Sequence, residues 1–165
     1  MATYIQIGST VTVGAGGSAT IEFTSIPSTY TDLKIVMSLR SNSADLDTLI
    51  SFNGSSTSFT AKRLYGSGSA AASDSTSRSA GLLDMSTYTA STFANNEIYI
   101  PNYTGSTNKS FSVDSVTENN ATAAYSLLNA GLWSNTAAIT SITVAPSLGS
   151  FVQYSTASLY GISKS

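Results

Sequence analysis

Apolar and polar residues alternate along most of the chain with a period of two. The clearest example is the segment 33–40, LKIVMSLR, in which Leu33, Ile35, Met37 and Leu39 occupy every second position. Successive side chains of a β-strand point to opposite faces, so this pattern predicts a strand with these four residues facing a core. No segment shows the periodicity of an amphipathic helix. The pattern therefore predicts an all-β protein.

Other segments rich in β-branched and aromatic residues, bounded by Gly, Pro, Asn and Ser, are also predicted as strands. They are 19–23, 48–53, 58–65, 93–100, 109–117, 123–133, 138–144 and 156–162, with a short strand or turn at 81–85 and an edge strand or hairpin at 4–13. Ile139 is predicted to face away from Ile142 and Val144. The Ala and Leu content of 123–132 would also suit a single helix, but Gly131 and the neighbouring strands favour a strand.

Three of these predicted strands lie in the segment 97–133, which ends at the most hydrophobic part of the chain. Trp133, the only tryptophan, closes it. A large aromatic side chain usually marks the deepest packing of a small β domain. We therefore expect 97–133 to form the scaffold and Trp133 to lie in the core.

The connections between strands complete the predicted fold. Asn53-Gly54 is a strong type I′ turn signal, which predicts that 58–65 returns antiparallel to 48–53. The segment 66–80, GSGSAAASDSTSRSA, is low in complexity and is predicted as the one long, flexible loop. Many short strands with regularly spaced turns predict a single antiparallel β-sandwich domain over 1–165. A jelly roll is favoured because it accommodates many strands in two sheets, and an immunoglobulin-like sandwich is the second choice.

Composition excludes several classes of function. The chain has 165 residues, only 10% of them charged, and a formal net charge of −2 with no block of either sign. Binding to nucleic acid needs clustered Lys and Arg, so it is not expected. No apolar run is long enough for a bilayer, and the N-terminal residues lack a secretory signal, which predicts synthesis in a cytoplasm. Without His or Cys, no catalytic residues and no cofactor are predicted.

The carboxylates offer two candidate sites. Asp45 and Asp47 have a spacing that suits calcium coordination, but the calcium-loop motif is absent, which favours solvated residues in a connecting loop. Glu97, Asp114 and Glu118 are candidates for the paired carboxylates of a glycosidase. With so few charges on a sandwich, surface carboxylates with local partners are the favoured interpretation. Neither site is therefore predicted to be catalytic or metal-binding.

Aromatic rings beside amide groups suggest glycan binding, because the ring stacks on the sugar and the amide orients it. The candidates that share this character are Tyr99, Tyr103, Asn119, Tyr125 and Trp133. The alternative, in which the alternating aromatic residues belong to the core, is favoured. A host surface glycan is thus a candidate partner.

Four segments are similar to a family of bacteriophage virion proteins, found in phages of marine and cyanobacterial hosts. They read SATIEFTSIPSTYTDLKIVMSLRS, EIYIPNYTGSTNKSFSVDSVTENNATA, AGLWSNTAAITSITVAP and STASLYGI, and the likeness extends from about Thr3 to Ile162. The resemblance implies a structural protein of the virion without enzymatic activity. It also implies assembly with other virion proteins, the major capsid protein among them. Stable attachment of a small domain to a shell generally needs more than one weak contact, so we expect further copies of the chain to join in a closed ring such as a homotrimer.

Within the particle, two roles follow from this resemblance. The first is a decoration or cement protein on the head surface. The second is a tail fibre or receptor-binding module that recognises a host glycan. The head is favoured, because a fibre subunit usually carries an attachment segment and a repetitive rod, whereas the first predicted strand here begins within a few residues of Met1. An enzyme such as a glycan hydrolase is the least favoured, given the missing His and the sparse carboxylates.

Overall fold

The computed structural model describes residues 3–120 and 124–163. Over these residues it contains β-strands and no helix, which confirms the all-β prediction. The strands are β1 (Thr3–Thr12), β2 (Ile21–Phe23), β3 (Asp32–Leu39), β4 (Asp47–Phe52), β5 (Phe59–Gly66), β6 (Ala71–Thr76), β7 (Ser79–Leu82), β8 (Ala94–Ile100), β9 (Lys109–Glu118), β10 (Ala124–Trp133), β11 (Ile142–Pro146) and β12 (Thr156–Ser163).

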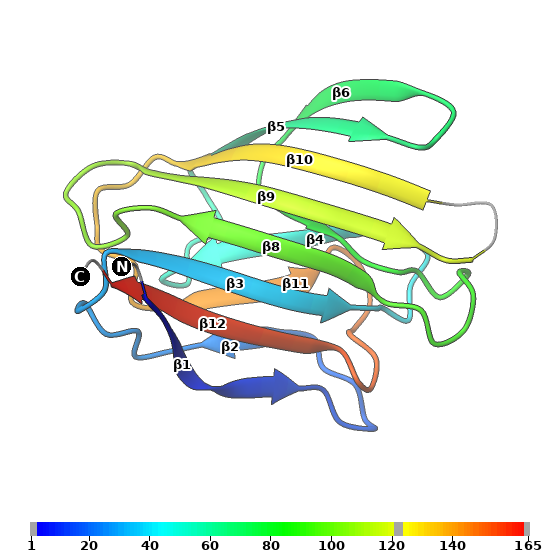
Figure 1. Ribbon diagram of the computed structural model, residues 1–165, viewed down its shortest axis with the longest axis horizontal. Coiled ribbons are helices and arrows are strands. Elements are labelled where there is room, and N and C mark those ends of the chain that lie inside the picture. Colours follow the sequence, from blue (N-terminus) through cyan, green and yellow to red (C-terminus); the bar gives the residue numbers. More distant parts are fainter. Residues whose placement is uncertain (1–2, 121–123, 164–165) are drawn as a thin grey trace.

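The strands form two antiparallel sheets of unequal size (Figure 1). The large sheet has eight strands in the order β1-β12-β3-β8-β9-β10-β5-β6, and the small sheet has four in the order β2-β11-β4-β7. The two sheets pack against each other, so the predicted antiparallel sandwich is confirmed. The division into eight and four strands does not confirm a jelly roll, nor the seven-to-nine-stranded immunoglobulin arrangement.

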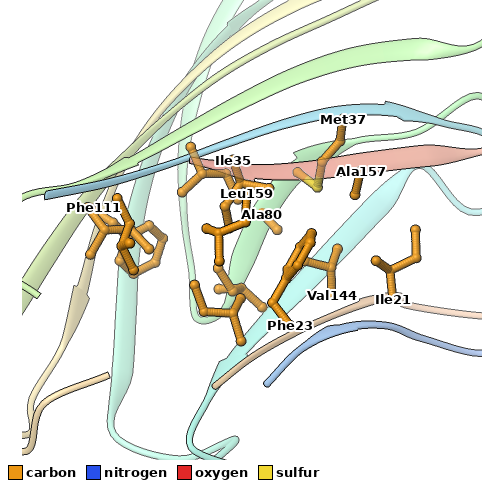
Figure 2. Close-up of a cluster of buried hydrophobic side chains, with 14 of the residues drawn as sticks. Ile21, Phe23, Ile35, Met37, Ala80, Phe111, Val144, Ala157 and Leu159 are labelled. Atoms are coloured by element: carbon orange, nitrogen blue, oxygen red, sulfur yellow. The ribbon is translucent and has the colours of Figure 1, made fainter. Parts of the chain in front are cut away.

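The hydrophobic core lies between the sheets. The four apolar residues of β3 are all buried, as the alternation predicted. Figure 2 shows Ile35 and Met37 of the large sheet facing Phe23 and Val144 of the small sheet. The fold therefore follows from the period-two pattern, because most of the strands present one apolar face to the opposite sheet.

Trp133 lies at one end of this core and is 1% exposed. Its ring stacks on Phe59 with centroids 6.0 Å apart and meets Phe52 edge to face at 5.5 Å. Phe111 joins the cluster through Phe52, and its ring lies over Gly131, where an added Cβ would come within 2.2 Å of it. The predicted core position of Trp133 is confirmed. The scaffold prediction also holds, since β8, β9 and β10 are neighbours in the large sheet.

Two predicted connections are wrong. Asn53 and Gly54 form the expected turn, with positive φ angles of 52° and 72°. The chain then crosses to the other sheet, so β5 pairs with β10 and β6 while β4 pairs with β11 and β7. A turn signal determines only a local reversal of the chain. Burial of Phe59 beside Trp133 places β5 in the large sheet, next to β10. The predicted loop 66–80 is largely strand, because it contains β6 and the start of β7.

Three smaller predictions concern the first strand, the segment 123–132 and Ile139. The first strand is a single edge strand with a bulge between Ile7 and Val11, so the hairpin alternative is wrong. The segment 123–132 is a strand from Ala124 onward, which excludes the helix alternative there. Ile139 is buried together with Ile142 instead of facing away from it, because it precedes β11 in a loop and does not follow the strand's alternation.

Candidate functional site

A groove lies where the large sheet extends beyond the small one. Along β5, Arg63 and Tyr65 continue the inward-facing register of Phe59 and Ala61, past the last strand of the small sheet. Tyr125 of β10, the segment 44–47 at the start of β4 and Leu82 of β7 line a space of about 340 Å³ around them. That volume lies in the range of small-molecule sites. The uneven sizes of the two sheets thus create a hollow lined by polar and aromatic side chains.

Arg63 is the centre of this groove. Its Nε and Nη2 donate to the two carboxylate oxygens of Asp74 at 2.8 and 2.7 Å, and its Nη1 donates to Asp47 Oδ1 at 2.7 Å. Asp74 stands directly opposite Arg63 in the β5–β6 pair. The hydrogen bonds from Arg63 lower the pKa of Asp74, and those to Asp74 raise the pKa of Arg63. A bidentate pair of this kind holds the planar guanidinium in one orientation.

The charges of the groove select among ligands. Asp45, Asp47 and Asp74 supply three carboxylates against the single guanidinium of Arg63, so the groove is negative. The Arg63 side chain is 14% exposed, whereas Asp47 and Asp74 are 38% and 37% exposed. The carboxylates are therefore accessible as hydrogen-bond acceptors. Together with the tyrosine rings of the lining, they suit a neutral ligand rich in hydroxyl groups better than an anion.

A second unusual feature lies on the outer side of the same strands. Leu64 of β5 and Leu128 of β10 are 56% and 58% exposed, and Val116 of β9 is 41% exposed. Leu64 and Leu128 stand directly opposite each other in register. We call these three residues the leucine face. A cluster of exposed large apolar side chains, as opposed to scattered single ones, is typical of an interaction surface.

The structure does not bring the predicted glycan residues together. Trp133 and Tyr103 are buried, and the Tyr103 hydroxyl donates to the Pro27 carbonyl. Asn119 is also buried. Tyr99 is on the outer face of β8, where its hydroxyl donates to Asp32 at 2.9 Å. Of the predicted set, Tyr125 alone lines the groove.

Asp45 and Asp47 lie at the groove edge with local partners. Asp45 Oδ1 accepts the backbone N–H of Asp47 at 2.9 Å, and the Asp47 carboxylate pairs with Arg63. Within residues 3–120 and 124–163, no group of three or more His, Cys, Asp or Glu side chains is placed to hold a metal ion. The geometry thus gives both carboxylates a role in shaping the groove.

Two of the three predicted glycosidase carboxylates are neighbours. Glu97 stands opposite Asp114 on the outer face of β8 and β9, and it forms an ion pair with Lys34 at 2.8 Å. Glu118 lies at the end of β9 and accepts the backbone N–H of Asn120 at 2.7 Å. The pair Glu97 and Asp114 therefore lies on the open side of the sheet, away from the groove.

Sequence reasoning missed Arg63, Tyr65 and Asp74 as groove residues. Asp74 falls in the segment that was predicted as a loop, so its pairing with Arg63 was not visible. One signal was present, however. In the alternation Phe59, Ala61, Arg63, a charged residue occupies the core-facing register, and buried or half-buried charges usually have a specific partner.

Comparison with protein-family models, curated proteins and solved structures finds no match to the chain. In the described part of the chain there is also no helix that could cross a membrane. The groove and the leucine face are therefore the two surfaces from which function is inferred.

Proposed function

We propose that the chain is a non-enzymatic structural protein of a bacteriophage virion, attached to the head surface as a decoration or cement protein. The resemblance of its sequence segments to virion proteins supports the phage assignment. The main support for a role in assembly is the leucine face, because it exposes a cluster of apolar side chains in a chain whose core is otherwise well covered. Complete burial of a leucine or valine side chain contributes about 1.5–3 kcal/mol, so covering this face with protein is favourable.

Particles with and without the protein test this proposal. We expect particles that lack it to assemble and infect, but to rupture at lower temperature or at low ionic strength. Supplying the double variant Leu64→Ser/Leu128→Ser should not restore robustness, because the apolar face through which the protein assembles is lost. Leu148→Ser is the matched control, since Leu148 is 60% exposed and lies outside this face. Depleted particles that are as robust as intact ones, yet fail to adsorb to the host, contradict the head assignment.

The groove favours a second candidate function, a tail fibre or receptor-binding module that recognises a host glycan. Tyrosine side chains in its lining offer apolar ring faces, and the oriented Arg63 and its carboxylates offer hydrogen-bonding groups. Ligand sites commonly combine an apolar wall with a few placed polar groups in this way. Of the two functions, the groove supports glycan recognition and the leucine face supports assembly.

Substitution of the groove tyrosines tests glycan recognition. Screening the purified protein against an array of neutral and acidic oligosaccharides should identify neutral ones. Tyr65→Ala and Tyr125→Ala should each weaken binding of the identified oligosaccharide about tenfold, because loss of a stacking ring removes on the order of 1 kcal/mol. Tyr154→Ala is the control, since Tyr154 is exposed and does not line the groove. Unchanged affinity in both groove variants, with unchanged melting temperature, excludes the groove as the site.

A further inference from the structure

We infer that the leucine face is covered by a second copy of the chain, so that two copies pack face to face about a two-fold axis. The inference rests on the proposed assembly role of this face and names its partner. Three properties of the described surface support it: its shape, the charges at its margins and the protection of the two sheet edges.

The shape of the face is self-complementary. Leu64 and Leu128 form a ridge, because they are opposite each other on neighbouring strands and both project outward. Hollows of about 440 and 450 Å³ adjoin this ridge, one beside Val116 and the other beside Lys62 and Ala130. In a two-fold contact, the ridge of each copy enters a hollow of the other. An isologous interface requires this reciprocity, in which the same patch supplies both the projection and the recess.

The charges at the margins are also arranged for a two-fold contact. Asp114 on β9 stands opposite Leu128 and so lies at one end of the ridge, whereas Lys62 lies two residues along β5 from Leu64, so the two charges occupy different margins of the leucine face. A two-fold axis in the contact plane that passes through the centre of the ridge and exchanges these two margins places Lys62 of each copy near Asp114 of the other. Among the described residues neither charge has an ion-pair partner, and Lys62 Nζ donates only to the Ser75 hydroxyl.

The two edges of the large sheet are less suited to self-association. The edge strand β6 carries Asp74, an inward-pointing charge that is held by Arg63. The opposite edge strand β1 is interrupted by a bulge that includes Gly8 with a φ of 71°. Inward charges and bulges are features that hinder edge-to-edge pairing. Association through the face is therefore favoured over extension of the sheet.

Sedimentation of the purified chain provides the first test. The wild-type protein should be a dimer, and Leu64→Ser/Leu128→Ser should raise the dimer dissociation constant about 100-fold or more, because both copies lose both central apolar side chains. Leu148→Ser should remain a dimer. Circular dichroism and thermal melting must show that the double variant is folded. A wild-type monomer at the highest soluble concentration, or a trimer, overturns the two-fold inference.

A charge exchange provides the second and sharper test. Lys62→Glu and Asp114→Lys should each weaken self-association about tenfold, because each places like charges together at both margins. An equimolar mixture of the two variants should form a heterodimer, in which the two introduced charges pair at one margin and the native Lys62 and Asp114 pair at the other. Failure of the mixture to associate more strongly than either variant alone overturns the inference.

The outcome for this inference is separable from that for the proposed function. If the wild-type chain is monomeric and the leucine-face variant still fails to join particles, another virion protein covers the face. The dimer is then wrong, while the virion assignment stands. If the dimer forms as expected but the protein is absent from purified virions, the virion assignment is wrong and the dimer stands.

Discussion

Replacing Trp133 with alanine is expected to lower the free energy of unfolding by about 3–5 kcal/mol, the usual scale for a buried aromatic side chain. Trp133 is 1% exposed, and its ring contacts Phe52 and Phe59 at centroid distances of 5.5 and 6.0 Å. The substitution leaves a cavity that these rings fill only in part. Urea denaturation followed by far-ultraviolet circular dichroism measures the change, since the variant has no tryptophan emission.

Two further substitutions separate packing from other roles of this residue. Trp133→Phe should cost less than Trp133→Ala, because it keeps an aromatic ring and leaves a smaller cavity, and the Nε1 of Trp133 has no hydrogen-bond partner among the described residues. Tyr154→Ala should leave stability nearly unchanged, because Tyr154 is exposed. A Trp133→Ala variant with wild-type stability but impaired glycan or host binding contradicts the core role.

Replacing Arg40 with methionine is expected to lower the free energy of unfolding by about 3 kcal/mol. The substitution removes the donor of three backbone carbonyls; each carbonyl left without a hydrogen bond costs about 1–3 kcal/mol, and part of this cost is recovered where water replaces the guanidinium. The Arg40 side chain follows β3 and is almost fully buried. Its guanidinium donates to the carbonyls of Tyr88, Thr89 and Thr92 at 3.0, 2.9 and 3.1 Å. These bonds hold the segment 85–93 against the sandwich, so the variant should also lose hydrogen-exchange protection there.

Arg78 provides the matched control for this loss. It donates from Nη1 to the Ser51 hydroxyl at 2.9 Å, and it makes no ion pair among the described residues. Arg78→Met should therefore change stability by about 1 kcal/mol or less. Equal effects of the two substitutions, or unaltered exchange in 85–93, indicate that the Arg40 bonds contribute little to the fold.

The groove and the leucine face use opposite sides of the same strands. On β5, Arg63 and Tyr65 point into the groove, whereas Lys62 and Leu64 point outward. This arrangement follows from the period of two along a strand. A dimer formed through the outer face therefore leaves the groove open to ligand, and substitutions on one surface are expected to leave the other intact.

The local pattern of the sequence determined the fold class and much of the core. The alternation in β3 correctly placed Leu33, Ile35, Met37 and Leu39, and the size of Trp133 correctly marked deep packing. Both follow from properties of single strands: the fixed alternation of side chains, and the large apolar area of one residue. These properties do not depend on which strands become neighbours.

Only the tertiary structure decided the strand pairing and, with it, both candidate surfaces. The turn at Asn53-Gly54 formed as predicted, yet β4 and β5 belong to different sheets. Arg63 meets Asp74 because β6 pairs with β5. The sequence of β6, AASDST, has no alternation of large apolar residues from which this strand could be predicted. Leu64 meets Leu128 only because β5 pairs with β10. Pairing between strands distant in sequence, such as β5 and β10, depends on the packing of the whole core, and a local pattern of side chains does not encode that partner choice.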